Sequence, residues 1–395
     1  MATNREKLLK LLHGEDPGEI IVCPLIDSWA FEDTSEKVFV PGEDEFTTAH
    51  TARGPIEDQL HMGEICGYEP IALRDIDWTL ANPSLVWQEE LVSKDVAAGK
   101  RIDLLTLHTP YGDIVHRRQT SLESSMRVEE SELTIQQRHA IIEWYADQIA
   151  ACDLDAIKAQ IKGYVETRGE RGLLSSSVAD PFGLFGLLGR GFEHLVYHYA
   201  DYPDEHMRLA GRIVELAKFQ ADVILAGDYD VIWAGGTGGS SYNSPAYYRR
   251  TRMPHTKQVV EHIQGQGGLV YTHDCNAVGV MIREGVFNEL SPSVLETLAP
   301  PPAGDIDDLQ AYRRMLSPSI CTKGNIDVGF LLDASVEQVR QATLEVIEAT
   351  KGYRHMVGTG DDVYFGTPIE NIKAMVDVAK NYTGRWRPTA CPDKD

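Results

Sequence analysis

The feature that most constrains the fold is a regular alternation of two kinds of segment from about residue 130 onward. Short runs that are apolar almost throughout alternate with longer segments in which apolar residues recur at helical spacing. Short, continuous apolar runs are typical of strands that are buried on both faces of a parallel sheet. The alternation therefore predicts an α/β fold in which helices cover a parallel sheet.

The form of this sheet follows from what stands at the strand ends. No Gly-x-Gly-x-x-Gly follows a first strand, which weighs against a dinucleotide-binding fold. Polar residues end most of the expected strands, as in a (β/α)8 TIM barrel. We expect one barrel domain over residues 1–395, with an insertion at about 85–130. Within it, "RIDLLTLHTPYGDIVHRRQT" alternates on both sides of a Pro/Gly turn and predicts an inserted β-hairpin in the N-terminal half.

Charge and composition restrict the partners and the compartment. A net charge of −23 argues against a nucleic-acid partner or an anionic membrane surface. No apolar run approaches the ~18 residues that would span a membrane, and the N-terminus has no signal-peptide core. The six cysteines are scattered without any Cys-x-x-Cys, as expected for thiols in a reducing compartment. These features predict a cytoplasmic protein that acts on a small molecule.

The segment "THDC" places a histidine and a cysteine at the end of an expected strand. His273 and Cys275 share one face, because side chains in a strand repeat every two residues. Two such donors can hold a metal ion, and zinc suits a mixed nitrogen and sulfur site. The alternative is an imidazole that is hydrogen-bonded to a carbonyl, beside an inert thiol.

A catalytic zinc typically has three protein ligands and one open position. Glu296 in "LETLAPPP" and Asp361 in "GTGDD" stand at strand ends and are candidates to complete the metal site. The glycine-rich residues 235–241 lack the Lys-Ser/Thr of a P-loop, which favours a loop over the barrel mouth. Further polar residues expected at the same rim are candidate catalytic or substrate-positioning groups: Asp180, Tyr242, Asn325 and Asp327.

Five motifs follow one another along the C-terminal half of the chain: "THDC", "LETLAPPPAGDID", "CTKGNIDV", "VGTGDD" and "GTPIENIKAMVDVAK". Their order and spacing resemble the uroporphyrinogen decarboxylase superfamily, and the opening "NREKLLKLLHGEDPGEIIVCP" is also similar to the start of that family. The resemblance covers most of the chain except residues from about 27 to 130. It implies a (β/α)8 barrel, in agreement with the strand and helix pattern.

One branch of this superfamily, which the chain resembles most, contains zinc methyltransferases that work with corrinoid proteins. Their motif is His-x-Cys followed by a distant cysteine. His273 and Cys275 match the pair, but Thr359 stands where the distant cysteine is expected. The resemblance implies a methyltransferase that moves a methyl group between a small methylated substrate and a corrinoid or folate carrier. An oxygen ligand, Glu296 or Asp361, would replace the missing thiolate.

Two other functions stay open. The first is a metal-free decarboxylase or lyase that uses Asp75 and Asp180, although "VCPLIDSWAFED" stands where the decarboxylases have an arginine-rich motif. The second is a non-catalytic barrel that binds a corrinoid or tetrapyrrole through aromatic residues such as Trp29, Trp233 and Tyr242.

Overall fold

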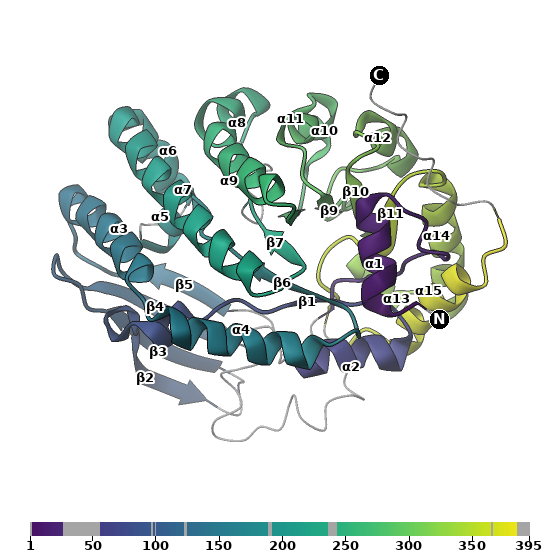
Figure 1. Ribbon diagram of the computed structural model, residues 1–395, viewed down its shortest axis with the longest axis horizontal. Coiled ribbons are helices and arrows are strands. Elements are labelled where there is room, and N and C mark those ends of the chain that lie inside the picture. The colour runs from purple at the N-terminus through teal and green to yellow at the C-terminus, as the bar shows by residue number, and fades with distance from the viewer. Residues whose placement is uncertain are drawn as a thin grey trace.

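The computed structural model describes residues 2–26, 56–95, 98, 100–121, 125–188, 192–235, 243–364 and 366–384. Parallel strands form a strongly curved sheet in the order β1-β6-β7-β8-β9-β10-β11 (Figure 1). Their order follows the chain, as repeated strand–helix units require. The predicted α/β TIM-barrel fold is thus confirmed. The strands are β1 (Ile71–Leu73), β6 (Leu173–Ser177), β7 (Val231–Trp233), β8 (Leu269–Asp274), β9 (Val294–Thr297), β10 (Cys321–Ile326) and β11 (His355–Thr359).

The segment at residues 21–25 lies between β11 and the start of β1. The Cys23 amide donates to the Val357 carbonyl over 2.8 Å, and the Val357 amide donates to the Ile21 carbonyl over 2.9 Å. On the other side, the Glu69 amide donates to the Val22 carbonyl over 2.8 Å. This segment therefore takes the eighth position of the barrel and joins its two ends.

Helices surround the sheet and connect its strands (Figure 1). The long helical region before β7 is divided at Pro203, which begins a new helix where its missing N–H is not needed. The helices are α1 (Asn4–His13), α2 (Ile56–Cys66), α3 (Ile135–Ala150), α4 (Leu154–Arg168), α5 (Gly183–Leu188), α6 (Phe192–Asp201), α7 (Pro203–Ala226), α8 (Pro245–Thr251), α9 (Met253–Gly265), α10 (Gly279–Arg283), α11 (Val286–Leu290), α12 (Leu309–Met315), α13 (Val328–Asp333), α14 (Val336–Ala349) and α15 (Ile369–Lys380), with short 3₁₀ turns at Trp78–Ala81 and Pro83–Leu85.

The insertion is an antiparallel sheet at one end of the molecule (Figure 1). It consists of β2 (Gln88–Asp95), β3 (Lys100–Leu107), β4 (Ile114–Ser121) and β5 (Ser125–Glu129), in that order. The predicted hairpin is confirmed as β3 and β4, which pair on either side of the "PYGD" turn. The flanking strands β2 and β5, which pair with β3 and β4, were not predicted. Apolar residues of this sheet share a buried cluster with α3 and α7, so the insertion is packed onto the barrel.

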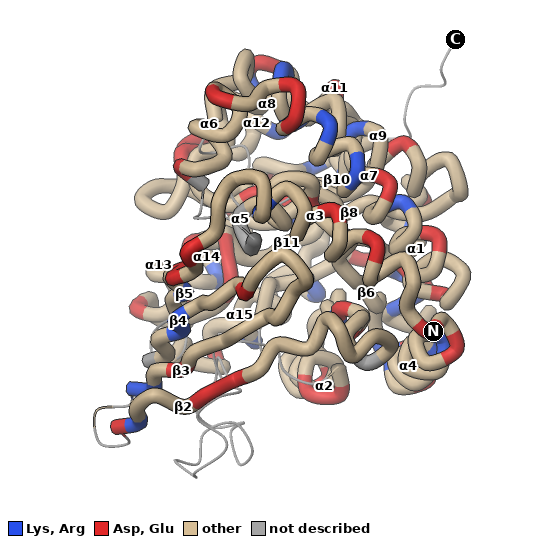
Figure 2. The backbone as a smooth tube through the Cα atoms, turned by 90° about the vertical axis from the view of Figure 1, so that its left-hand side faces the viewer, with Lys and Arg blue, Asp and Glu red and all other residues tan. Residues whose placement is uncertain are grey.

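The barrel interior is apolar towards the amino ends of the strands. Leu173, Val231 and Leu269 meet there with Leu8 and Leu11 of α1, which closes this end. Acidic and basic residues are spread over the outer helices and the inserted sheet (Figure 2). Within the described residues, the helices include none with the length and apolarity needed to cross a membrane.

The polar side chains of the barrel interior gather near the carboxyl ends of the strands, opposite the apolar end that α1 closes.

Candidate active site at the barrel mouth

Ionisable side chains from consecutive strands lie side by side in the barrel. Glu296 of β9 is in register with His273 of β8 and with Lys323 of β10. His273 Nδ1 donates a hydrogen bond to Glu296 Oε2 over 3.0 Å, and Lys323 Nζ binds the other carboxylate oxygen. All three side chains are buried. Because both carboxylate oxygens are engaged, Glu296 compensates the charge of Lys323 and fixes the imidazole of His273.

Two aromatic rings hold this network in place from β7 and β8. The rings of Trp233 and Tyr271 are stacked with centroids 4.6 Å apart, and Trp233 is also stacked on His273 at 5.6 Å. The Tyr271 hydroxyl accepts a hydrogen bond from Lys323 Nζ over 3.0 Å. The stack limits the motion of the imidazole and leaves little space for water around the ion pairs.

The charges of the network shift the protonation of its members. Burial alone would lower the pKa of His273, but its hydrogen bonds to Cys275 and Glu296, together with the charge of Glu296, raise the pKa to about 10. Burial would raise the pKa of Glu296, yet the charges of Lys323 and His273 hold that pKa well below its usual range. Glu296 is therefore ionised, and the proton on His273 Nδ1 is held by a carboxylate.

His273 and Cys275 lie close together, as their spacing predicted. A side-chain hydrogen bond joins them, and the charge of Asp361 also acts on His273. Since Glu296 takes Nδ1, Nε2 is the ring nitrogen of His273 that is left for other contacts. Imidazoles that bind metals are commonly oriented by such a carboxylate. Glu296, predicted as a metal ligand, has both carboxylate oxygens engaged by His273 and Lys323.

Zinc fits this arrangement in part. His273 and Cys275 supply one nitrogen and one sulfur donor, the set that zinc prefers. In the part of the chain that the structure describes, however, no three His, Cys, Asp or Glu side chains are grouped so that they could hold a metal ion. The described residues therefore offer two ligands, one fewer than the three typical of a catalytic zinc.

Thr359, which stands where the resemblance expects a cysteine, has a structural contact. Its hydroxyl accepts a hydrogen bond from the Leu25 amide over 3.0 Å, and the side chain is fully buried. Thr359 thereby joins β11 to the segment that closes the barrel. Cys321 is likewise buried, among the apolar residues at the amino end of β10.

The predicted polar residues beyond this network fall into separate places. Asp180 follows β6, where it accepts a hydrogen bond from the Gly183 amide over 2.9 Å and pairs with Arg252 at 3.2 Å. Asp75 follows β1 and accepts a hydrogen bond from the Ser177 amide over 2.7 Å. Tyr242, Trp29 and most of the glycine-rich segment lie outside the described residues.

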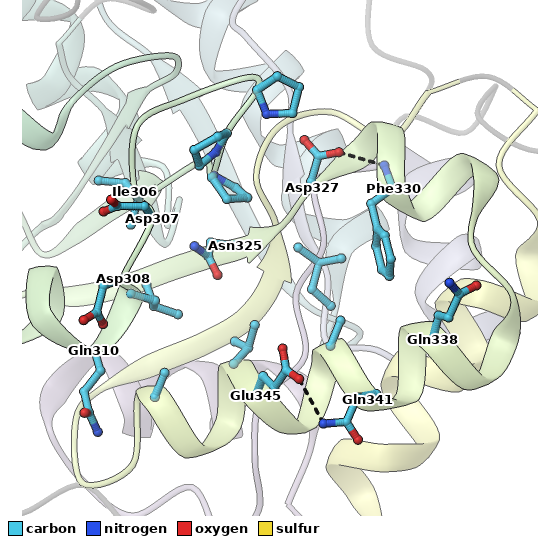
Figure 3. Close-up of a pocket in the computed structure, with 18 residues that line it drawn as sticks. Ile306, Asp307, Asp308, Gln310, Asn325, Asp327, Phe330, Gln338, Gln341 and Glu345 are labelled. Atoms are coloured by element: carbon cyan, nitrogen blue, oxygen red, sulfur yellow. Dashed lines mark hydrogen bonds between the residues drawn. The ribbon is translucent and has the colours of Figure 1, made fainter.

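Asn325 and Asp327 line a groove of about 790 Å³ beside the barrel mouth (Figure 3). Its walls are the loop after β9 and helix α14. Asn325 Nδ2 donates to the Leu298 carbonyl over 3.0 Å, and Asp327 Oδ1 accepts from the Phe330 amide over 2.7 Å at the start of α13. Both side chains thus have local structural partners, and Asp327 is a helix N-cap.

Lys323 and Tyr271 belong to the network but were not among the predicted site residues. The signal was present in "CTKGNID": a lysine in the middle of an otherwise buried strand needs a buried anion. The nearest such residue in a neighbouring expected strand is Glu296. The two are distant in sequence, so strand order was needed to pair them.

The fold and the position of the network define a TIM-barrel protein with its candidate site at the carboxyl ends of the strands, where barrel enzymes carry their active sites. Residues 146–382 match the family model of uroporphyrinogen decarboxylase. Because this match covers more than half of the chain, the protein belongs to the uroporphyrinogen decarboxylase family.

Individual relatives are more distant. The uroporphyrinogen decarboxylase of Trichodesmium erythraeum is 29% identical over 195 residues, which cover 46% of this chain and 48% of that protein. The chloroplastic enzyme of Nicotiana tabacum is 27% identical over 145 residues, 35% of this chain and 33% of the relative. The match thus spans less than half the length of either relative. A methyltransferase from Methanosarcina mazei has the same fold, with a TM-score of 0.66, 15% identity and coverage of 96% of this chain and 98% of that one.

Proposed function

We propose that this family member is an enzyme that moves a methyl group between a small methylated substrate and a carrier, at the carboxyl ends of β8 and β9. The observation that carries the proposal is the paired arrangement of His273 and Cys275, with Glu296 holding the imidazole from behind. The shared fold with a methyltransferase supports the same reading. A corrinoid protein or a folate would be the carrier.

His273 and Cys275 would hold a zinc ion, which supplies Lewis acidity to a leaving oxygen or lowers the pKa of a thiol. The chain's own residues prepare the pair. Glu296 keeps a proton on His273 Nδ1, so that Nε2 is the ring nitrogen that would bind a metal ion, which would displace the Nε2 proton. Lys323 compensates the negative charge of Glu296 and keeps this carboxylate ionised.

The proposal is tested by elemental analysis of protein purified without added metal or chelator. We expect about one zinc per chain, as in a single catalytic site. Cys275→Ala should lose the metal, whereas the matched control Cys66→Ala, a buried cysteine on α2, should keep it. Transfer of methyl groups to cob(I)alamin, followed by absorbance, should be lost with the metal. A wild-type protein that takes up no zinc, even when zinc is supplied, would contradict the proposal.

A second candidate is a metal-free decarboxylase. It is favoured by the net positive charge of the network formed by His273, Lys323 and Glu296, which would attract a carboxylate substrate to the barrel mouth, and by the names of the curated relatives. In that case no zinc would be present, and release of carbon dioxide from a pyrrole carboxylate would replace methyl transfer as the measured reaction.

A further inference from the structure

The groove beside the barrel mouth, of about 790 Å³, lies apart from the His273 network (Figure 3). Sites for small molecules commonly enclose roughly 300–1,000 Å³, so the groove is large enough for a small organic ligand. Part of its lining is apolar and buried, from Leu309, Ile326 and Val346. The groove can therefore take a ligand with an apolar portion, and its polar groups determine the charge of that ligand.

Four carboxylates from different elements stand around the groove (Figure 3). Asp307 and Asp308 precede α12, Asp327 follows β10 and Glu345 belongs to α14. In the part of the chain that the structure describes, none of them forms an ion pair, and no Lys or Arg lines the groove. A cleft lined by charges of one sign concentrates ions of the opposite sign. These carboxylates therefore favour a cationic ligand.

A second observation, independent of the carboxylates, points to a hydrogen-bond donor in the groove. Asn325 is only 7% exposed, and its Nδ2 donates to the Leu298 carbonyl over 3.0 Å. A carbonyl can only accept, so this contact fixes which end of the amide faces the groove. Oδ1 is directed into the groove and has no hydrogen bond to any described residue (Figure 3). An acceptor in a nearly buried side chain is unfavourable without a donor, and an N–H group of a ligand would supply one.

The acceptors are too dispersed for a metal ion, because no three His, Cys, Asp or Glu side chains of the described residues are grouped to hold one. An ammonium group has three donors and no acceptor, so it matches carboxylates and an amide oxygen. Ammonium groups joined by methylene chains would carry charge to separate walls and place apolar surface between them. We propose that this groove binds a linear polyamine, with one ammonium group donating to Asn325 Oδ1 and others paired with Asp307 and Glu345. The inference does not depend on the proposed methyl transfer.

Spermidine is the probe, and titration calorimetry on the full chain at fixed ionic strength should detect one binding site. The double variant Asp307→Asn/Glu345→Gln alters two exposed carboxylates of the groove and should weaken binding roughly tenfold, the loss of two surface ion pairs. The control Asp333→Asn/Glu337→Gln removes the same charge from exposed positions outside the groove and should bind spermidine as the wild type does. Absence of a site in the wild type, or equal weakening in the two double variants, would overturn the proposal.

Further measurements test the donor contact and the kind of occupant. Asn325→Leu keeps a side chain of similar size and should weaken spermidine binding roughly tenfold, the loss of a hydrogen bond to a charged group. Unchanged affinity in this variant would reject the contact with Oδ1. Trilysine has the same net charge as spermidine, and tighter binding of this peptide would reject a polyamine in favour of a basic protein segment. Where Asn325→Leu does not fold, the exposed double variant decides, because neither of its positions is buried.

Discussion

The buried carboxylate of Glu296 pairs with two cationic side chains at once, His273 and Lys323. It is fully buried between His273 and Lys323, so neither cation can turn to water for solvation. Removal of one partner from a buried ion pair leaves an uncompensated charge, which costs far more than the pair itself contributes. The stability of the barrel interior and the orientation of the candidate ligand His273 therefore depend on the same side chain.

Glu296→Gln keeps the shape of this side chain and removes its charge. We expect the free energy of unfolding to fall by roughly 3–5 kcal/mol, measured by urea denaturation. The control Glu345→Gln changes an exposed carboxylate on α14 and should stay within about 0.5 kcal/mol of the wild type. Equal effects of the two substitutions would show that Glu296 does not compensate buried charge.

The buried histidine His206 of α7 predicts a pH dependence of stability. The pKa of His206 is lowered from 6.5 to about 4 in the folded protein. Between these values the unfolded chain binds a proton that the folded protein does not, so stability falls as the pH is lowered. The free energy of unfolding should therefore decrease from pH 6.5 towards pH 4, and less steeply in His206→Gln. His262→Gln, which alters a partly exposed histidine of α9, should retain a slope close to that of the wild type.

At the scale of single residues, only part of the site was open to prediction. Spacing in one strand placed His273 beside Cys275, because the two-residue repeat is local. The partners of Glu296 depend on which strands are neighbours and on their register, and neither is encoded in a short motif. For the same reason Asp327 looked like a rim residue, although its carboxylate caps α13.

At the scale of elements, the strand and helix pattern of the C-terminal two-thirds was predicted well, because each element carries its own periodicity. The break between α6 and α7 is also local, because α7 begins at Pro203. The inserted sheet was harder. Its outer strands β2 and β5 are largely exposed where the structure describes them, so they lack the apolar pattern by which the β3–β4 hairpin was recognised.

The inserted sheet should unfold together with the barrel, because Ile114 of β4 is fully buried in a cluster that includes Ile141 of α3 and Ile213 of α7. Ile114→Ala should lower the free energy of unfolding by roughly 2–5 kcal/mol in a single urea transition. Val128→Ala, at an exposed position of β5, should change it by less than about 0.5 kcal/mol. A separate early transition in Ile114→Ala would instead show that the insertion is an independent unit.

At the scale of the whole molecule, the barrel is closed by residues from both ends of the chain. Glu69, buried just before β1, accepts a hydrogen bond from the Val22 amide over 3.0 Å and pairs with Lys380 of the last helix. Lys380 Nζ also donates to the Ile20 carbonyl over 3.3 Å. One side chain thus connects the closing segment, the first strand of the sheet and α15.

Glu69→Ala should weaken this closure without removing apolar contacts from the sheet. We expect a loss of roughly 1.5–3 kcal/mol in the free energy of unfolding, the value for hydrogen bonds to a charged group, with an unchanged dependence on urea. Glu64→Ala is the matched control, because Glu64 forms only partly exposed ion pairs on α2 and should cost less than about 1 kcal/mol. If Glu69→Ala cost no more than Glu64→Ala, the backbone pairing of residues 21–25 with β11 would be sufficient to close the barrel. A larger loss in Glu69→Ala would mean that closure also depends on a charged contact between the two ends of the chain.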